Sequence, residues 1–205
     1  MHPYSYLTIA SPAEGIYKEK GSKFLAFAYP VHSEIEIKEK IEALRKEYFD
    51  ARHHCFAWVL GTDKARFRSF DDGEPNHSAG DPILGKIRSA ALTNILVVVV
   101  RYFGGVKLGI GGLIGAYKAA AEDVLTNARV IEEHVTEVWT LNFEYETTSE
   151  MMRLLKEIDL KILSQDFTDK TQLKISVPVQ EKEKLQSRLE LMKALGKSID
   201  WYCES

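Results

Sequence analysis

The chain has 205 residues, of which 45% are hydrophobic and 28% charged, with 27 Lys and Arg against 30 Asp and Glu. These values are ordinary for globular proteins and exclude a disordered or fibrous chain. The longest aliphatic run, Ile95 to Val100, has six residues, whereas a membrane-spanning helix needs about 20. Two cysteines cannot build a disulfide framework or a four-thiolate zinc site. Nothing near Met1 resembles a signal peptide, so we expect a cytoplasmic protein without membrane contact.

The charge balance changes along the chain. Residues 1–130 carry 17 basic and 15 acidic side chains, a net charge of +2, whereas residues 131–205 carry 10 basic and 15 acidic side chains, a net charge of −5. A domain that coats nucleic acid nonspecifically is much more basic than either part. Any anion site is therefore local, and we predict two domains, residues 1–130 and residues 131–205.

The first part of the chain predicts strands and helices in alternation. Residues 4–10 and 16–30 predict strands, and Ser33 with Glu36 forms a capping box that opens a helix. Residues 55–60 and 65–70 predict a strand pair, followed by a polar loop over residues 71–80. Pro82 fits the first turn of a helix that runs to Ala91, with Asp81 expected as its N-cap. The β-branched run 95–100 is typical of a strand buried on both faces, and a loop from Gly104 to Gly112 then leads into a helix.

The second part has a more regular pattern. Polar and apolar residues alternate over 139–145, and Thr147 with Glu150 predicts a second capping box for a helix that reaches Ile158. Strands are expected around Ile162 and over 173–177, then a helix over 185–192 and a last strand over 199–203. This order, β-α-β-β-α-β, is the ferredoxin-like pattern. The predicted fold class is therefore α+β.

Three side chains near the first predicted strand pair have metal-binding chemistry. His53, His54 and Cys55 are residue types that bind zinc, and a cysteine beside a histidine can be an activated nucleophile. Adjacent residues on a strand point to opposite faces, however, so His53 and His54 do not face one metal ion without distortion. We therefore favour a structural role for Cys55 and predict no metal site.

An acidic turn follows the strand pair. Asp71, Asp72 and Glu74 are three carboxylates within four residues, held in a tight turn by Gly73 and Pro75. They could hold Mg²⁺ or act as acid and base. Alternatively, their side chains cap the next helix. The sequence leaves both interpretations open.

The segment from residue 101 to residue 112 is the most unusual. Five glycines fall within nine positions between a buried strand and a helix: Gly104, Gly105, Gly109, Gly111 and Gly112. Such a segment exposes backbone amides that can hold an anion, and Arg101 and Lys107 add positive charge. The spacing fits neither a phosphate-binding P-loop nor a dinucleotide fingerprint. The alternative is a loop that needs glycine only for its backbone angles and close packing.

These segments resemble the YigZ/IMPACT family, in its bacterial two-domain type. The resemblance is carried by three strings: Asp71-Asp72-Gly73-Glu74-Pro75, Ala79-Gly80 with Pro82-Ile83-Leu84, and Arg101-Tyr102-Phe103-Gly104-Gly105 with Leu108-Gly109 and Gly111-Gly112-Leu113. The segment from Lys20 to Phe24, including Lys23, is similar to the family as well. The chain departs from the family at Gly115, where relatives usually carry Arg, and at His77-Ser78, where Gly-Thr is commoner.

The resemblance implies the fold of both domains and a setting in translation. Residues 1–130 should resemble the second domain of ribosomal protein S-five, and residues 131–205 should be ferredoxin-like. Eukaryotic members regulate translation through a partner of a stress kinase and use an extra N-terminal domain for this, so we do not transfer that mechanism. No agreed reaction comes with the bacterial type.

Two classes of function follow. The first is a translation-associated binding protein whose N-terminal domain contacts RNA, the ribosome or an anionic ligand through Arg101, Lys107 and the glycine-rich segment, assisted by Lys20 and Lys23. The second is a metal-dependent hydrolase or phosphotransferase acting at the acidic turn. No nucleophile–base pair can be placed from the sequence, so we favour binding. We assign no catalytic residue, cofactor or oligomeric state.

Overall fold

The computed structural model describes residues 4–167 and 171–204. The first three residues, on which part of our interpretation of the N-terminus rests, lie outside the described residues. The chain forms two compact units: an N-terminal unit, Tyr6–Glu133, and a C-terminal unit, His134–Ser205 with Met1–Ser5. The C-terminal unit thus begins close to the boundary after Val130 that the sequence predicts.

The N-terminal unit is built on a five-stranded antiparallel sheet with the strand order β2-β3-β6-β4-β5. The strands are β2 (Ala13–Glu19), β3 (Ser22–Pro30), β4 (His53–Leu60), β5 (Arg66–Phe70) and β6 (Ile95–Tyr102). β6 lies at the centre of this sheet, and residues 95–100 are fully buried on both of its faces. The prediction for this strand is confirmed.

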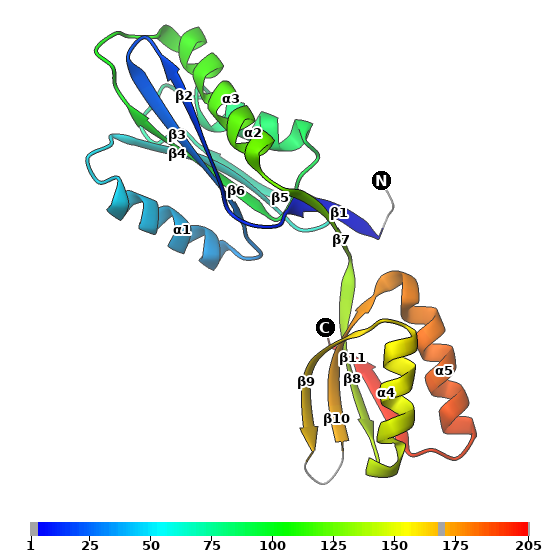
Figure 1. The fold of residues 1–205 in the computed structure, drawn as a ribbon. Helices are drawn as coiled ribbons and strands as arrows, with labels where there is room; N and C mark the ends of the chain where they lie inside the picture. The colour runs from blue at the N-terminus through cyan, green and yellow to red at the C-terminus, as the bar shows by residue number, and fades with distance from the viewer. Residues whose placement is uncertain (1–3, 168–170, 205) are drawn as a thin grey trace. The chain divides into compact units, whose positions relative to one another are not determined.

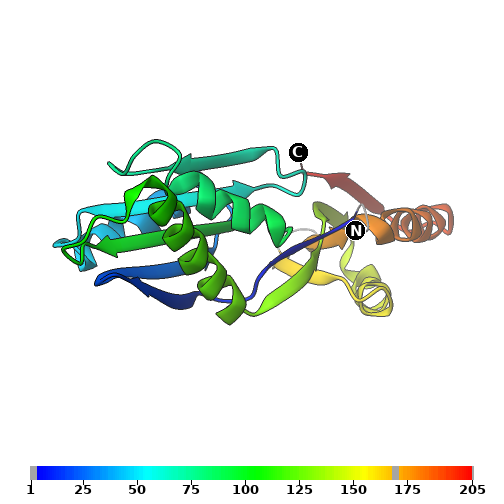
Figure 2. The same cartoon turned by 90° about the horizontal axis from the view of Figure 1, so that it is seen from above.

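Helices cover both faces of this sheet. α1 (Glu34–Glu47) packs on one face, and α2 (Gly80–Ser89) and α3 (Gly109–Asn127) pack on the other (Figure 1). Figure 2 looks onto the face that carries α2 and α3. Side chains alternate along β6, so that Val97 and Val99 join the core under α2 and α3, whereas Leu96 and Val98 join the core under α1. This alternation is the ordinary geometry of a strand.

A second, two-stranded sheet pairs β1 (Ser5–Ile9) with β7 (Val130–His134). The Tyr6 hydroxyl donates a hydrogen bond of 2.7 Å to the Glu133 carboxylate across this pair. We did not predict β7, because strand pairing between segments this far apart in the chain leaves no local pattern.

The helix starts bear out the predicted capping only in part. Ser33 caps α1 as predicted, since the Glu36 N–H donates to its Oγ at 3.2 Å. The Glu36 carboxylate, however, accepts from the N–H of His32, one residue before the N-cap, at 3.0 Å. The prediction of Asp81 as the N-cap of α2 is wrong, since Ala79 stands at that position. The N–H groups of Ala79 and the next residue donate instead to Asp71 Oδ1, at 2.9 and 2.8 Å, so a side chain from the preceding turn caps this helix.

The C-terminal unit contains β8 (Thr136–Phe143), α4 (Thr148–Glu157), β9 (Lys161–Phe167), β10 (Thr171–Pro178), α5 (Lys182–Ala194) and β11 (Ile199–Cys203), with short 3₁₀ turns η1 (Tyr145–Thr147) and η2 (Val179–Glu181). The predicted β-α-β-β-α-β order is present, and the strands form an antiparallel sheet in the order β11-β8-β10-β9. α4 and α5 lie on the same side of that sheet (Figure 1). Both units therefore have the predicted α+β composition.

Two details of this unit were predicted wrongly. The strand β8 ends at Phe143, and Tyr145 lies in η1 with 76% of its surface exposed. Thr147 has a helical backbone (φ −88°, ψ −8°) and makes no capping hydrogen bond. An N-cap residue needs an extended backbone to aim its side chain at the first N–H groups, so the 3₁₀ turn removes the expected capping box. Within residues 4–167 and 171–204, every helix is too short or too polar to cross a membrane.

Candidate anion-binding site

The acidic turn and the glycine-rich segment meet in one pocket of the N-terminal unit. The pocket has a volume of about 630 Å³, which lies within the range of about 300–1,000 Å³ that is usual for ligand sites. Its walls include Glu74 of the turn, Arg101, Lys107 and Gly109 of the glycine-rich segment, and also His53 and Phe103. Of the three carboxylates of the turn, Glu74 thus shares a pocket with the glycine-rich segment.

Strand pairing brings the first side chains of the pocket together. His53 at the start of β4 lies directly opposite Arg101 near the end of β6, and Phe24 of β3 lies opposite Arg101 on its other side. Residues opposite one another on antiparallel strands share a face of the sheet. The Arg101 guanidinium accordingly lies over the Phe24 ring, 5.5 Å from its centroid. This face is the one that carries α2 and α3.

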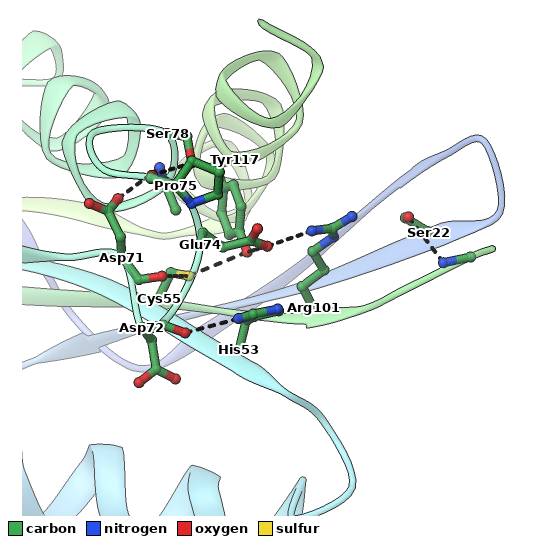
Figure 3. Close-up of polar contacts among 12 residues, drawn as sticks. Ser22, His53, Cys55, Asp71, Asp72, Glu74, Pro75, Ser78, Arg101 and Tyr117 are labelled. Carbon is green, nitrogen blue, oxygen red and sulfur yellow. Dashed lines mark hydrogen bonds and ion pairs between the residues drawn. The ribbon is translucent and has the colours of Figure 1, made fainter. Parts of the chain in front are cut away.

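Arg101 forms a buried ion pair with Glu74. Its Nη1 donates to Glu74 Oε1 at 2.6 Å, and the two side chains are only 7% and 4% exposed. The Tyr117 hydroxyl of α3 donates to the same oxygen at 2.8 Å. Figure 3 shows Glu74 between Tyr117 and Arg101. The acidic turn therefore holds Arg101 in place and neutralises its charge.

The guanidinium has a buried donor without a partner. Arg101 Nε is buried, and no described residue accepts a hydrogen bond from it. A buried donor without a partner is costly. Because this atom has almost no exposed surface, a ligand in the pocket does not reach it.

Cys55 has a structural role, as predicted. It is fully buried, and its Sγ lies 3.0 Å from the carbonyl oxygen of Asp71 and 3.3 Å from the Tyr117 hydroxyl. Burial raises the pKa of the Cys55 thiol well above its usual range, and burial likewise raises the pKa of Tyr117. Because a thiolate is the reactive form of cysteine, this thiol is inert.

The carboxylates of the acidic turn do not converge on one point. Asp71 accepts from the N–H groups that begin α2 and, at 2.8 Å, from the His77 N–H. Asp72 accepts from Arg45 Nη2 at 2.9 Å and from the His54 N–H at 2.7 Å. Figure 3 shows Asp71, Asp72 and Glu74 pointing in different directions. Among residues 4–167 and 171–204, His, Cys, Asp and Glu side chains form no group of three that could hold a metal ion. The turn thus fits the capping interpretation rather than the metal-binding one.

His54, beside this turn, makes the stability of the protein sensitive to pH. Its side chain is buried, and desolvation lowers its pKa below the ordinary value of 6.5. The unfolded chain therefore takes up a proton at a higher pH than the folded chain does. The contribution of His54 to the free energy of unfolding is fully present above about pH 6.5 and decreases as the pH falls toward the lowered pKa.

We expect His54→Phe to reduce this decrease in the free energy of unfolding, measured by urea denaturation between about pH 7 and pH 5. His134→Gln, at an exposed position, is the control that keeps the wild-type fall. Parallel curves for His54→Phe and wild type would contradict the assignment.

The positions of the glycine-rich segment require glycine for different structural reasons. Gly104 touches the β2–β3 turn: its N–H donates to Ser22 Oγ at 3.1 Å, and a Cβ built on it would lie 1.8 Å from the carbonyl carbon of Gly21. Gly105 and Gly109 have positive φ angles of 87° and 72°, which favour glycine. These three glycines are explained by the backbone.

The predicted loop is shorter than expected, because α3 already begins at Gly109. Gly111 and Gly112 therefore lie in the first turn of a helix and not in a loop. A Cβ on Gly112 would lie 3.0 Å from the Leu108 Cβ, whereas a Cβ on Gly111 would have no atom within 4 Å. Packing does not account for glycine at position 111.

The start of α3 is open to an anion. Leu108 stands at its N-cap and makes no side-chain capping bond, and the first turn has no acidic residue. The first N–H groups of a helix lack partners within the helix, and the helix dipole adds positive charge there. Gly109 of this turn lines the pocket, as does the exposed Lys107.

The other predicted cations lie elsewhere. Lys20 and Lys23 are exposed on and beside the β2–β3 turn, and neither is part of the pocket wall. Lys23 lies opposite Tyr102 in the pairing of β3 with β6. Both lysines are therefore placed on the same unit, but the structure does not bring them to the pocket.

The two departures from the family pattern also lie outside the pocket wall. Ser78 donates to the carbonyl of Pro75 at 2.6 Å, and His77 contacts the Asp81 carboxylate, also at 2.6 Å. Gly115 is exposed on α3, and a side chain built there meets nothing within 4 Å. Gly115 itself is therefore not part of the pocket wall.

Sequence reasoning missed several pocket residues, and His53 and Phe103 are the two with the clearest chemistry. His53 was considered only as a zinc ligand, although its pairing with Arg101 places it in the pocket wall. Phe103 was quoted in a motif but given no role, although its side chain lines the pocket and is 57% exposed. An exposed aromatic residue next to a glycine-rich turn was the available signal.

Comparison with known proteins identifies the family. Residues 20–125 match the Impact N-terminal domain. The chain is 32% identical over 187 residues to the IMPACT family member YigZ of Escherichia coli strain K12, covering 90% of this chain and 92% of YigZ. It is 30% identical over 180 residues to the family member YvyE of Bacillus subtilis strain 168, covering 88% of this chain and 82% of YvyE. A crystal structure described as that of a hypothetical protein superposes with a TM-score of 0.75 at 30% identity and covers 98% of both chains. These matches confirm the resemblance, and the chain belongs to the IMPACT family.

Proposed function

We propose that the N-terminal unit is a phosphate-binding module that contacts RNA, free or in the ribosome, as part of a regulatory role in translation. One observation carries this proposal: the uncapped start of α3 and the charge of Lys107 belong to a single pocket. Donors of both kinds are those that bind phosphate oxygens in proteins.

The charges of the pocket make this a local site. Glu74 offsets the charge of Arg101, so the net attraction comes from Lys107 and the dipole of α3. Arg101, paired with Glu74, contributes no free charge. The contact therefore positions one phosphate group and does not select a base.

The setting in translation rests on the family. The motifs of this chain are similar to those of the family, and the eukaryotic members of the family are translational regulators. On the same family resemblance we propose the finer fold assignments. Residues 1–130 would form a domain like the second domain of ribosomal protein S-five, and residues 131–205 a ferredoxin-like domain. The strand order β11-β8-β10-β9 supports the second assignment. A cytoplasmic location belongs to the same proposal.

Sedimentation of the full chain with ribosomes and with free RNA tests the proposal. We expect co-sedimentation at about 50 mM salt that decreases at about 200 mM, because a fourfold rise in salt weakens binding by about threefold for each phosphate contacted. Lys107→Ala should reduce the bound fraction at both salt concentrations. An absence of binding at low salt, or binding that salt does not change, would show that the pocket has another ligand.

A further inference from the structure

We propose that the pocket holds one ribonucleotide, with its phosphate at the start of α3, its ribose 2′-hydroxyl on His53 and its base on Phe103. The inference rests on the proposed phosphate site and adds the ligand that the site selects. The same chemistry is offered by a single-stranded RNA segment and by a free ribonucleotide.

The hydrogen bonds of His53 define its chemistry. Its Nδ1 lies 2.9 Å from the backbone carbonyl oxygen of Asp72. A carbonyl oxygen only accepts hydrogen bonds, so Nδ1 carries a proton, and the uncharged tautomer with this proton has its lone pair on Nε2. Figure 3 shows the ring between Asp72 and Arg101, with its second nitrogen turned away from Asp72. Because His53 lines the pocket, this lone pair is an acceptor in the pocket wall.

The acceptor distinguishes His53 from the rest of the phosphate site. Lys107 and the first N–H groups of α3 are donors and suit an anion. A lone pair repels a phosphate oxygen and instead pairs with a hydroxyl group. Donors and an acceptor in one pocket therefore fit a ligand that carries a phosphate and a hydroxyl group. Within a strand, ribose retains a free hydroxyl at the 2′ position and deoxyribose has none.

Phe103 supplies an apolar wall for a base. Its ring is 57% exposed, and the Arg101 guanidinium lies 5.8 Å from the ring centroid. The exposed side chain of Ile110 extends the same apolar surface along the pocket. Proteins that bind single strands stack bases on exposed aromatic rings, and cations next to the ring strengthen this.

The test compares RNA with DNA on the full chain. Binding of an oligouridylate and of the matching oligodeoxyuridylate is measured by fluorescence anisotropy at fixed salt. We expect the RNA to bind about three- to tenfold more tightly, the effect of one net hydrogen bond. UMP and dUMP, measured by calorimetry, show whether a free nucleotide is held with the same preference or whether an RNA segment is needed.

Two variants of His53 separate recognition from structure. His53→Asn retains a side-chain N–H at the position of Nδ1 for the Asp72 carbonyl but has no group at Nε2, so the preference for RNA should disappear. His53→Gln places an amide group near Nε2 and should retain part of the preference. Thermal unfolding of both variants controls for stability. A preference for RNA that persists in His53→Asn would overturn the role of His53.

Phe103 is tested in the same assay. Phe103→Leu should weaken binding of RNA and DNA alike by about fivefold or more, the effect of losing one stacked base, whereas Phe103→Trp should retain binding. Unchanged affinity in Phe103→Leu would overturn the stacking role. Salt-dependent binding of RNA and DNA with equal affinity would refute the ribonucleotide and leave the phosphate site intact. If neither strand binds, the proposed function itself fails.

Discussion

Arg101→Ala is expected to lower the free energy of unfolding by about 3–5 kcal/mol, because it leaves the Glu74 carboxylate buried without its charged partner. Glu74 is 4% exposed and retains only the Tyr117 hydroxyl as a donor in this variant. The ion pair is 2.6 Å long, and both of its side chains are buried. Urea denaturation monitored by circular dichroism measures the loss.

Two further variants show whether the unpaired charge is the cause. Glu74→Leu combined with Arg101→Met removes both charges, and replacing a buried ion pair by apolar groups is often neutral for stability. This double variant should recover most of the stability that Arg101→Ala loses. Lys107→Ala, at an exposed position, should change stability by less than about 0.5 kcal/mol. A double variant as unstable as Arg101→Ala would contradict the explanation. Arg101→Ala is for the same reason unsuitable as a binding variant, since it perturbs the fold.

Gly104→Ala is expected to destabilise the protein by at least about 3 kcal/mol, at the upper end of overpacking effects. The new Cβ would lie 1.8 Å from the carbonyl carbon of Gly21 and 2.1 Å from the Ser22 nitrogen. Both are backbone atoms, so the methyl group fits only if the β2–β3 turn moves away and the hydrogen bond from the Gly104 N–H to Ser22 Oγ breaks. The thermal unfolding midpoint reports the loss.

Gly111→Ala is the matched control. Position 111 lies in α3, and a Cβ added there would have no atom within 4 Å. Alanine is preferred to glycine in a helix by about 0.5–1 kcal/mol. This variant should therefore be more stable than wild type. If Gly104→Ala unfolds at the wild-type temperature, the close contact between the two turns is not present in solution.

Local sequence patterns predicted most of the secondary structure. The run 95–100 was assigned to a strand buried on both faces because it has apolar residues at every position, and β6 occupies the centre of the sheet. Ser33 also caps α1 as predicted. Features that depend on distant contacts were missed or misplaced. Asp71, and not Asp81, caps α2, because the helix begins at Gly80 and Asp81 therefore lies inside it. The Asp81 carboxylate accepts instead from the Ser69 hydroxyl.

The candidate site was predicted as residues but not as an arrangement. Arg101 was expected to be a free cation, yet the fold pairs it with Glu74. Glu74 had been considered only as part of an enzyme site at the acidic turn. Charge and spacing in a sequence show which groups are available but not which of them neutralise one another. His53 joined the site through strand pairing with Arg101, a register that has no signature in the local sequence.

The slope of RNA affinity against salt concentration tests the central claim most directly, measured on wild type, Lys107→Ala and Lys118→Ala. Lys118 is exposed on the same helix but is not part of the pocket wall, so Lys118→Ala removes an equal charge from the same unit. We predict that Lys107→Ala weakens binding and reduces the slope by about one, the contribution of one phosphate contact, while Lys118→Ala retains the wild-type slope. Equal slopes for Lys107→Ala and wild type would show that no phosphate binds at the start of α3.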